Sequence, residues 1–314
     1  MSKASEPVLA DFSNPFQRYF AATRPAFLTA TLAACLLGLA GAYHSGIQIQ
    51  LSTALLTLLL AMLVHAGVNV LNDYFDALNG TDAANTERLY PFTGGSRFIQ
   101  NGVLTLKQTA CFGYSLLGIS IVGGLWLSWK VGYGLLLIGI VGVFVGWAYS
   151  SVQPRLNARG LGELCVMVGF LGVVIGADYV QRHTFSFQPM IIGMAYALLA
   201  TNLLYINQFP DRKADAMVGK HNLVVRLPLS LAVWGYLIWM MLALIWVVAM
   251  LWMGHLPKLA AFSVLPLLFS WRAFLRLKQF AAEPAKLLAA IQLTLASMLG
   301  HALLLTIIML WKTP

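Results

Sequence analysis

The chain has 314 residues, of which 59% are hydrophobic and only 10% are charged, and its mean hydropathy is +0.76. This number of charged groups is too small to cover the surface of a water-soluble globular protein of this size. The composition therefore excludes a soluble protein and predicts a polytopic membrane protein. The net charge of +9 would also suit nucleic acid. In a membrane chain, however, positive charge first reports orientation, and we expect no nucleic-acid partner.

The first 20 residues are polar and lack the short apolar core and cleavage site of a secretory signal, so we expect the first span to stay in the mature protein. The cysteines Cys35, Cys111 and Cys165 are odd in number and show neither CxxC nor Cys/His spacing. The sequence therefore predicts neither disulfides nor a zinc site.

Apolar runs long enough to cross a bilayer predict an all-α protein with nine transmembrane helices in a single domain, residues 1–314. The expected spans are 26–43, 51–71, 108–128, 132–149, 161–180, 189–206, 229–252, 256–271 and 288–311. Pro266 interrupts the eighth run and makes it the least regular. Since the count is odd, we expect the two termini on opposite sides of the membrane.

The basic residues predict the orientation. With these spans, all but four of the 20 lysines and arginines fall on one side, the exceptions being Lys130, Arg182, Lys258 and Lys312. The positive-inside tendency then places the N-terminus and the longer loops in the cytoplasm, with the chain in the cytoplasmic (inner) membrane. All acids except Asp178 share that side. Acids contribute little to orientation, so their position needs another explanation.

The first acidic cluster follows the second span, within NVLNDYFDALNGTD. Asn72 and Asp76 are four residues apart and share a face if the helix continues, and His65 and Asn69 extend that stripe back into the apolar run. Asp73 lies beside them, and Asp82 follows just past Gly80. Oxygen ligands of this kind suit Mg²⁺, which one or two carboxylates hold while substrate phosphates and water complete the octahedron.

A second cluster follows the sixth span and reads NQFPDRKADAMVGKHN. Asn207, Asp211 and Asp215 stand at four-residue steps on one helical face. The spacing echoes the first cluster and suggests a degenerate internal duplication. Because Pro210 removes a backbone donor, we expect the helix to fray or kink there.

Each cluster alone could be an ordinary helix end, where Asn, Asp and Gly serve as caps and turns. Two clusters with matched spacing at the same side favour paired metal sites that face each other, since close carboxylates repel one another unless a cation lies between them. Arg97, Lys213 and Lys220 are interleaved with the acids. This mixture indicates a metal diphosphate rather than a bare cation.

Other polar residues lie within or beside the spans. His65 falls in mid-span and must have a hydrogen-bond partner there. Tyr149 and Ser150 end the fourth span, where an interfacial aromatic anchor and a substrate-facing role are equally open. Arg24 opens the first span, where it can reach the interface or an anionic ligand.

These residues carry a family resemblance. NDYFDALNGTD resembles the first acidic motif of the UbiA superfamily of intramembrane aromatic prenyltransferases, and NQFPDRKAD resembles its second. The segments TRPAFLTA, GGSRFIQNG, GLGELCV, GADYVQ and GKHNLVVRL are similar to the branch that prenylates 1,4-dihydroxy-2-naphthoate in menaquinone biosynthesis. The likeness covers about residues 18–228. The chain departs from the common NDxxDxxxD pattern at Gly80.

The resemblance implies nine helices around a central cavity that opens to membrane lipid, under a cytoplasmic cap formed by the loops after helices 2 and 6. It implies Mg²⁺ as cofactor, with a polyprenyl diphosphate and an aromatic acid as substrates. The implied metal ligands are Asn72, Asp73, Asp76, Asp82, Asn207, Asp211 and Asp215. The implied substrate-binding residues are Arg24, Asn69, Tyr114, Arg97, Lys213 and Lys220, and the implied catalytic residues are Tyr149, Ser150, Asp76 and Asp211.

Two other functions stay open at this stage. The acceptor could be 4-hydroxybenzoate or another phenol, and the chain could instead be a cation transporter that binds ions through the Asn/Asp pairs. A transporter predicts acids near the bilayer midplane with few basic neighbours, whereas here they fall at one face among arginines. The sequence carries no signal for an oligomeric state.

Overall fold

The computed structural model describes residues 5–311, and this part of the chain is helical without a strand. The α-helices are α1 (Pro15–Ala22), α2 (Pro25–His44), α3 (Leu51–Leu78), α4 (Thr81–Ala84), α5 (Leu106–Val131), α6 (Gly134–Ser150), α7 (Gly162–Arg182), α8 (Gln188–Met217), α9 (Leu223–Arg226), α10 (Leu229–Trp252), α11 (Leu267–Phe280) and α12 (Leu288–Leu310). The 3₁₀ helices are η1 (Leu9–Asp11), η2 (Leu156–Arg159), η3 (Lys258–Val264) and η4 (Pro284–Lys286).

Eight helical segments of the described chain are long and apolar enough to cross a membrane, η3 and α11 together forming one of them. They confirm eight of the nine expected spans. The remaining run, 132–149, forms α6, which has only 17 residues. Pro266 caps α11, so the eighth span breaks into a 3₁₀ turn and an α-helix, and that helix continues to Phe280 instead of ending near residue 271.

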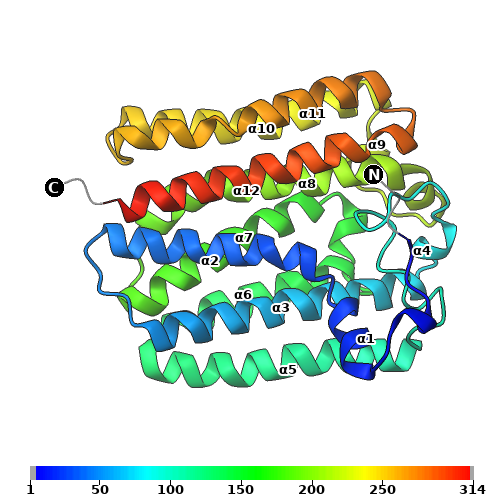
Figure 1. Ribbon diagram of the computed structural model, residues 1–314, viewed down its shortest axis with the longest axis horizontal. Coiled ribbons are helices and arrows are strands. Elements are labelled where there is room, and N and C mark those ends of the chain that lie inside the picture. The colour runs from blue at the N-terminus through cyan, green and yellow to red at the C-terminus, as the bar shows by residue number, and fades with distance from the viewer. Residues whose placement is uncertain (1–4, 312–314) are drawn as a thin grey trace.

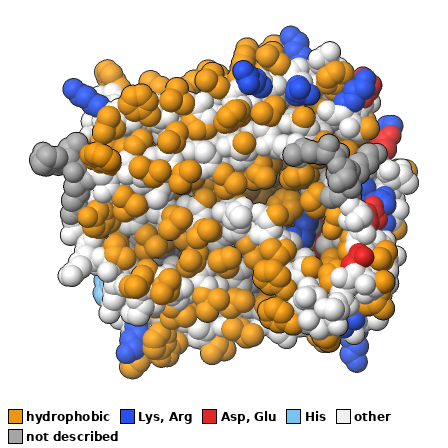
Figure 2. All heavy atoms as spheres, in the orientation of Figure 1, with side chains coloured by type: hydrophobic (Ala, Val, Ile, Leu, Met, Phe, Trp, Pro, Cys, Tyr) orange, Lys and Arg blue, Asp and Glu red, His pale blue; other side chains and the backbone are white. Residues whose placement is uncertain are grey.

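The helices lie side by side along the long axis of the molecule, and successive long helices run in opposite directions (Figure 1). The short helices α4 and α9 lie together at one end. The face seen in Figure 2 is largely hydrophobic between the two ends, and its acidic side chains gather at the α4 and α9 end. We call this end of the bundle the polar end.

Helix α8 lies at the centre of the bundle. It packs against α7, α10, α12 and α2, and 78% of its most apolar stretch is buried within the protein. Its 30 residues include Pro210, yet the helix continues to Met217 without the expected fraying. Contacts from neighbouring segments hold this last part, because Arg212 donates through Nε to the carbonyl oxygen of Val224 at 2.9 Å and through Nη2 to that of Leu227 at 3.1 Å.

Close helix contacts depend on glycine. Gly38 of α2 packs so tightly on α7 that a Cβ atom there would lie 2.3 Å from the carbonyl oxygen of Val174 and 2.8 Å from Cβ of Ala177. Backbone atoms of a packed helix cannot move aside as a flexible side chain can. The α2–α7 contact therefore requires a residue without a side chain at this position.

We predict that Gly38→Ala lowers the unfolding temperature of the purified protein in detergent, because overpacking of this kind costs about 1–3 kcal/mol. Gly118→Ala is the matched control, since a Cβ atom at exposed Gly118 of α5 meets nothing within 4 Å. Equal unfolding temperatures for the two variants would contradict the role of Gly38 in packing.

Candidate active site

A cavity of about 1330 Å³ runs from the polar end into the apolar interior, with walls from α2, α3, α5, α6, α7 and α8. Its wall is apolar along most of its length, and its polar groups concentrate where α3 and α8 end. Both helices are followed by a glycine with positive φ, Gly80 at +76° and Gly219 at +69°. A left-handed residue ends a helix without the steric strain a side chain would bring.

The structure brings residues of both acidic clusters to this one cavity. The predicted site residues in its wall are Arg24, Asn69, Asn72, Asp76, Asp82, Tyr149, Asn207, Asp211, Asp215 and Lys220. Nζ of Lys220 lies 3.4 Å from Oδ1 of Asp215 and 4.0 Å from Oδ2 of Asp76. One ammonium group therefore joins a carboxylate of α8 to a carboxylate of α3.

Two asparagines that the sequence reasoning did not single out complete the network. Asn85, after α4, donates to Oδ1 of Asp211 at 2.6 Å, so the loop of the first cluster contacts the helix of the second. Asn222 donates to Oδ2 of Asp215 at 2.7 Å and accepts from the amide of Val225 as the N-cap of α9. Asn222 lies in the GKHN segment and could have been found there, whereas no spacing in the sequence marks Asn85.

The remaining oxygens are suited to a hard cation. Oδ1 of Asp76, Oδ1 of Asn207 and Oδ1 of Asn85 are enclosed, and none has a hydrogen-bond partner among the described residues. In residues 5–311, no three carboxylate, imidazole or thiol groups converge closely enough to bind an ion by themselves. An ion such as Mg²⁺ fits these donors only if a ligand supplies further oxygens, which is the usual arrangement for Mg²⁺ with phosphates.

Charges at the polar end shift the ionisation of its groups. Burial by itself would lower the pKa of Lys220, but the carboxylates of Asp215 and Asp76 outweigh it and raise that pKa above its ordinary value. Burial raises the pKa of Asp82 well above its usual range, and the charges of Asp76 and Asp73 add to the effect. The site thus holds one firmly charged lysine among carboxylates that repel one another.

Five predicted residues do not line the cavity. Asp73 is buried behind the wall, where Oδ1 accepts from the amide of Ser96 at 3.1 Å. Ser150 is buried at the end of α6, and Tyr114 is exposed on α5. The side chain of Lys213 is 72% exposed and pairs with Glu87 at 2.6 Å.

Arg97, the fifth of these residues, supports the loop between α4 and α5 from behind. It has a φ of +67°, donates through Nη1 to the carbonyl oxygen of Asp82, and lies 3.6 Å from Glu6. Glu6 also binds Arg88 through two contacts of 2.6 Å. The carboxylate of Glu6, between Arg88 and Arg97, therefore attaches the N-terminal segment to this loop.

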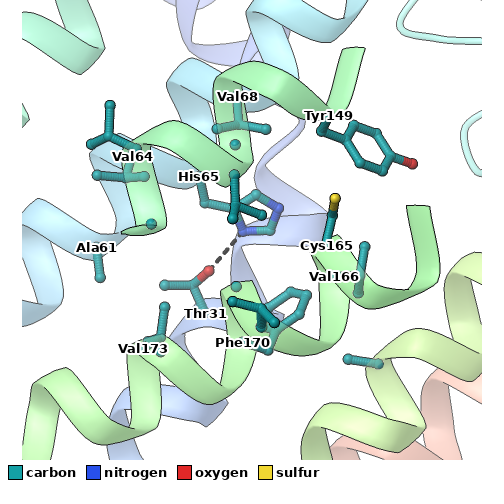
Figure 3. Close-up of a pocket in the computed structure, with 18 of the residues that line it drawn as sticks. Thr31, Ala61, Val64, His65, Val68, Tyr149, Cys165, Val166, Phe170 and Val173 are labelled. Carbon is teal, nitrogen blue, oxygen red and sulfur yellow. Dashed lines mark hydrogen bonds between the residues drawn. The ribbon is translucent and has the colours of Figure 1, made fainter. Parts of the chain in front are cut away.

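The side of the cavity nearest α2 presents Arg24 and Asn69. Arg24 has a φ of +58°, donates to the carbonyl oxygen of Pro91 at 3.3 Å, and stacks over the ring of Phe27 at 4.5 Å. Asn69 donates to the carbonyl oxygen of Thr23 at 3.1 Å. Tyr149, in the last turn of α6, lines the same cavity and lies close to Cys165 in the view of Figure 3.

The model of the UbiA prenyltransferase family matches residues 31–309. The chain is 32% identical to the 1,4-dihydroxy-2-naphthoate octaprenyltransferase of Escherichia coli, over 67% of this chain and 68% of that protein. It is 30% identical to the enzyme of the same name from Mycobacterium leprae, over 68% of this chain and 70% of that protein.

The fold is similar to that of a UbiA homologue from Archaeoglobus fulgidus whose structure contains DMAPP and Mg²⁺. The TM-score is 0.64, the sequence identity is 16%, and the match covers 93% of this chain and 99% of the homologue. At this identity the likeness establishes the fold.

We predict that Arg97→Gly speeds proteolytic cleavage within residues 85–102 by about five-fold, since the loop loses contacts worth about 1 kcal/mol. Glycine accepts the positive φ of this position, so the variant removes the guanidinium group without adding backbone strain. Arg276→Ala, which removes an exposed cation of α11 far from this loop in the sequence, should leave the cleavage rate unchanged. Equal cleavage of Arg97→Gly and the parent protein would show that Arg97 does not hold the loop.

Proposed function

This chain belongs to the UbiA prenyltransferase family, and from that membership we propose that it transfers a polyprenyl group from a prenyl diphosphate to 1,4-dihydroxy-2-naphthoate, with Mg²⁺ as cofactor and loss of the acceptor's carboxylate. It is a prenyltransferase and an integral membrane protein. The observation that carries the proposal is the ion pairing of Lys220 with Asp76 and Asp215, because it joins both acidic motifs at the polar end of one cavity.

We assign the diphosphate to this polar end. Lys220 would bind its oxygens, and Asn72, Asp76, Asn207, Asp211 and Asp215 would hold Mg²⁺, with Asp82 in support. The structural relative that contains DMAPP and Mg²⁺ supports this assignment. When bound with a diphosphate, Mg²⁺ would supply the positive charge that stabilises the leaving group.

The residues of the chain account for the rest of the reaction. Cleavage of the allylic carbon–oxygen bond leaves positive charge on the prenyl carbon, and the apolar wall of the cavity keeps water from that carbon. The aromatic face of Tyr149 can stabilise the charge by about 0.5–2 kcal/mol. The electron-rich acceptor ring then attacks the carbon and loses its carboxylate as CO₂. We assign Arg24 and Asn69 to the binding of the acceptor's polar groups.

The names of the relatives favour a naphthoate acceptor, and 4-hydroxybenzoate is the second choice. We also propose that α6 is a ninth crossing, since 17 residues lie at the lower limit for a spanning helix. The polar end would then face the cytoplasm, as the distribution of lysine and arginine predicts.

We predict that Asp76→Asn and Asp211→Asn each lower the rate of prenyl transfer by about 100-fold or more, since each removes a carboxylate from the charged end of the site. The rate is measured as prenylated product formed from radiolabelled prenyl diphosphate, with Mg²⁺ and with EDTA. Glu283→Gln removes an exposed acid outside the cavity and serves as the control. Turnover of either Asp variant within a few-fold of the parent protein would refute the metal assignment.

We predict that purified protein with one prenyl diphosphate and Mg²⁺ converts 1,4-dihydroxy-2-naphthoate to a product lacking the carboxylate, and converts 4-hydroxybenzoate much more slowly. Mass spectrometry of the products from a panel of aromatic acids makes the comparison. A product formed preferentially from 4-hydroxybenzoate would overturn the choice of acceptor, and ion uptake by proteoliposomes without any product would overturn the enzyme assignment.

A further inference from the structure

The wall of the cavity contains an imidazole away from its charged end. His65 lies seven residues before Asn72 on α3, which is about 10 Å along the helix axis. It is the only histidine in the cavity wall of the described chain, and its neighbours in Figure 3 include Val64, Val68 and Phe170. A polar ring within an apolar wall needs partners on both of its nitrogens.

Thr31 of α2 is the partner on one side. Its Oγ1 lies 2.7 Å from Nδ1 of His65. The hydroxyl of Thr31 has no other hydrogen-bond partner among the described residues, so its proton is best placed on the bond to Nδ1. A neutral imidazole that accepts at Nδ1 carries its proton at Nε2, so we assign Nε2 as a donor.

Packing fixes the plane of this ring. Phe170 of α7 meets His65 edge to face, with ring centres 5.8 Å apart, and Tyr196 of α8 meets Phe170 in the same way at 6.0 Å. The hydroxyl of Tyr196 donates to the carbonyl oxygen of Ala30 at 2.6 Å, one residue before Thr31. These contacts therefore form a closed circuit across four helices, α2, α3, α7 and α8, which closes through the backbone between Ala30 and Thr31.

The second nitrogen of His65 faces the cavity. In Figure 3 it points away from Thr31, toward the side where Tyr149 and Cys165 lie. It has no hydrogen-bond partner among the described residues and is not enclosed, whereas Nε2 of His301, a buried histidine of α12, is fully enclosed. The site thus offers one oriented donor to whatever fills this part of the cavity.

We propose that His65 is a specificity-determining residue that donates a hydrogen bond from Nε2 to an oxygen atom of the aromatic acceptor, with Thr31 as its positioning residue. The inference rests on the proposed function and names a group that binds its second substrate. A prenyl chain is hydrocarbon beyond its diphosphate and would leave the donor unpaired, which is costly in an apolar site. The phenolic and carboxylate oxygens of the acceptor are the ligand groups that can accept this bond.

The test compares His65→Leu with the parent protein in steady-state prenyl transfer. We expect KM for the acceptor to rise about ten-fold, as for the loss of one hydrogen bond in an apolar site, while KM for the prenyl diphosphate stays unchanged. His65→Gln retains a donor and should recover part of the loss. His44→Leu is the matched control, since His44 lies outside the cavity and bonds only the carbonyl oxygen of Met309.

Two further measurements separate binding from a structural role. Thr31→Val should raise KM for the acceptor by a smaller factor, and Thr31→Ser, which keeps the hydroxyl, should restore it. Naphthoate analogues that each lack one oxygen identify the contacted atom, because His65→Leu should cause no further loss with the analogue lacking that atom. An equal loss with every analogue, or a rise in KM for both substrates, would overturn the inference.

Equilibrium binding of 1,4-dihydroxy-2-naphthoate to the purified protein distinguishes a failure of this inference from a failure of the proposed function. If the parent protein binds the acceptor without forming product, the proposed function fails, and weaker binding by His65→Leu still supports the inference. Product formation with an unchanged KM in His65→Leu overturns the inference alone. A parent protein that neither binds nor converts the acceptor overturns both.

Discussion

The structure depends on one interaction, the contact of Lys220 with carboxylates from two helices that are far apart in the sequence. Asp76 lies in the last turn of α3 and Asp215 in the last turn of α8, and both side chains are buried. Carboxylates held this close repel one another, so the pair persists because a cation lies beside it. The contacts of Lys220 hold the two helix ends together but leave other oxygens without partners. A polyanion with divalent ions could bind to this combination of one ammonium group and several oxygen ligands.

The two ends of the cavity differ in polarity, which would separate the two substrates of the proposed reaction. Charged and amide groups gather at the polar end, and the rest of the wall is hydrocarbon with isolated polar groups such as His65. A molecule with a charged head and a long apolar tail has one orientation that satisfies both regions. With the proposed function, the aromatic acceptor would lie beside the junction of head and tail, and Asn69, Tyr149 and His65 of the cavity wall are the residues we assign to that region.

The spans and the two motifs could be predicted from the sequence because each is a local pattern. Hydrophobic length indicated eight of the crossings, and four-residue spacing placed Asn72 with Asp76 and Asp211 with Asp215 on common faces. The positions of Arg97 and Asp73 behind the cavity wall could not be predicted, because they depend on how a loop with left-handed residues folds back on α3. Asn85 was missed for the same reason, since its partner Asp211 lies 126 residues later.

The lengths of α3 and α8 have a consequence for the surrounding bilayer. At 1.5 Å per residue, the 28 and 30 residues of these helices extend about 42 and 45 Å, whereas the hydrocarbon region is about 30 Å thick. The acids lie in the final turns of both helices, so centring the apolar stretches in the bilayer would bring those turns to the level of the lipid headgroups. A membrane with longer acyl chains would bring those acids closer to the hydrocarbon region. The activity of the enzyme should therefore depend on the thickness of the membrane.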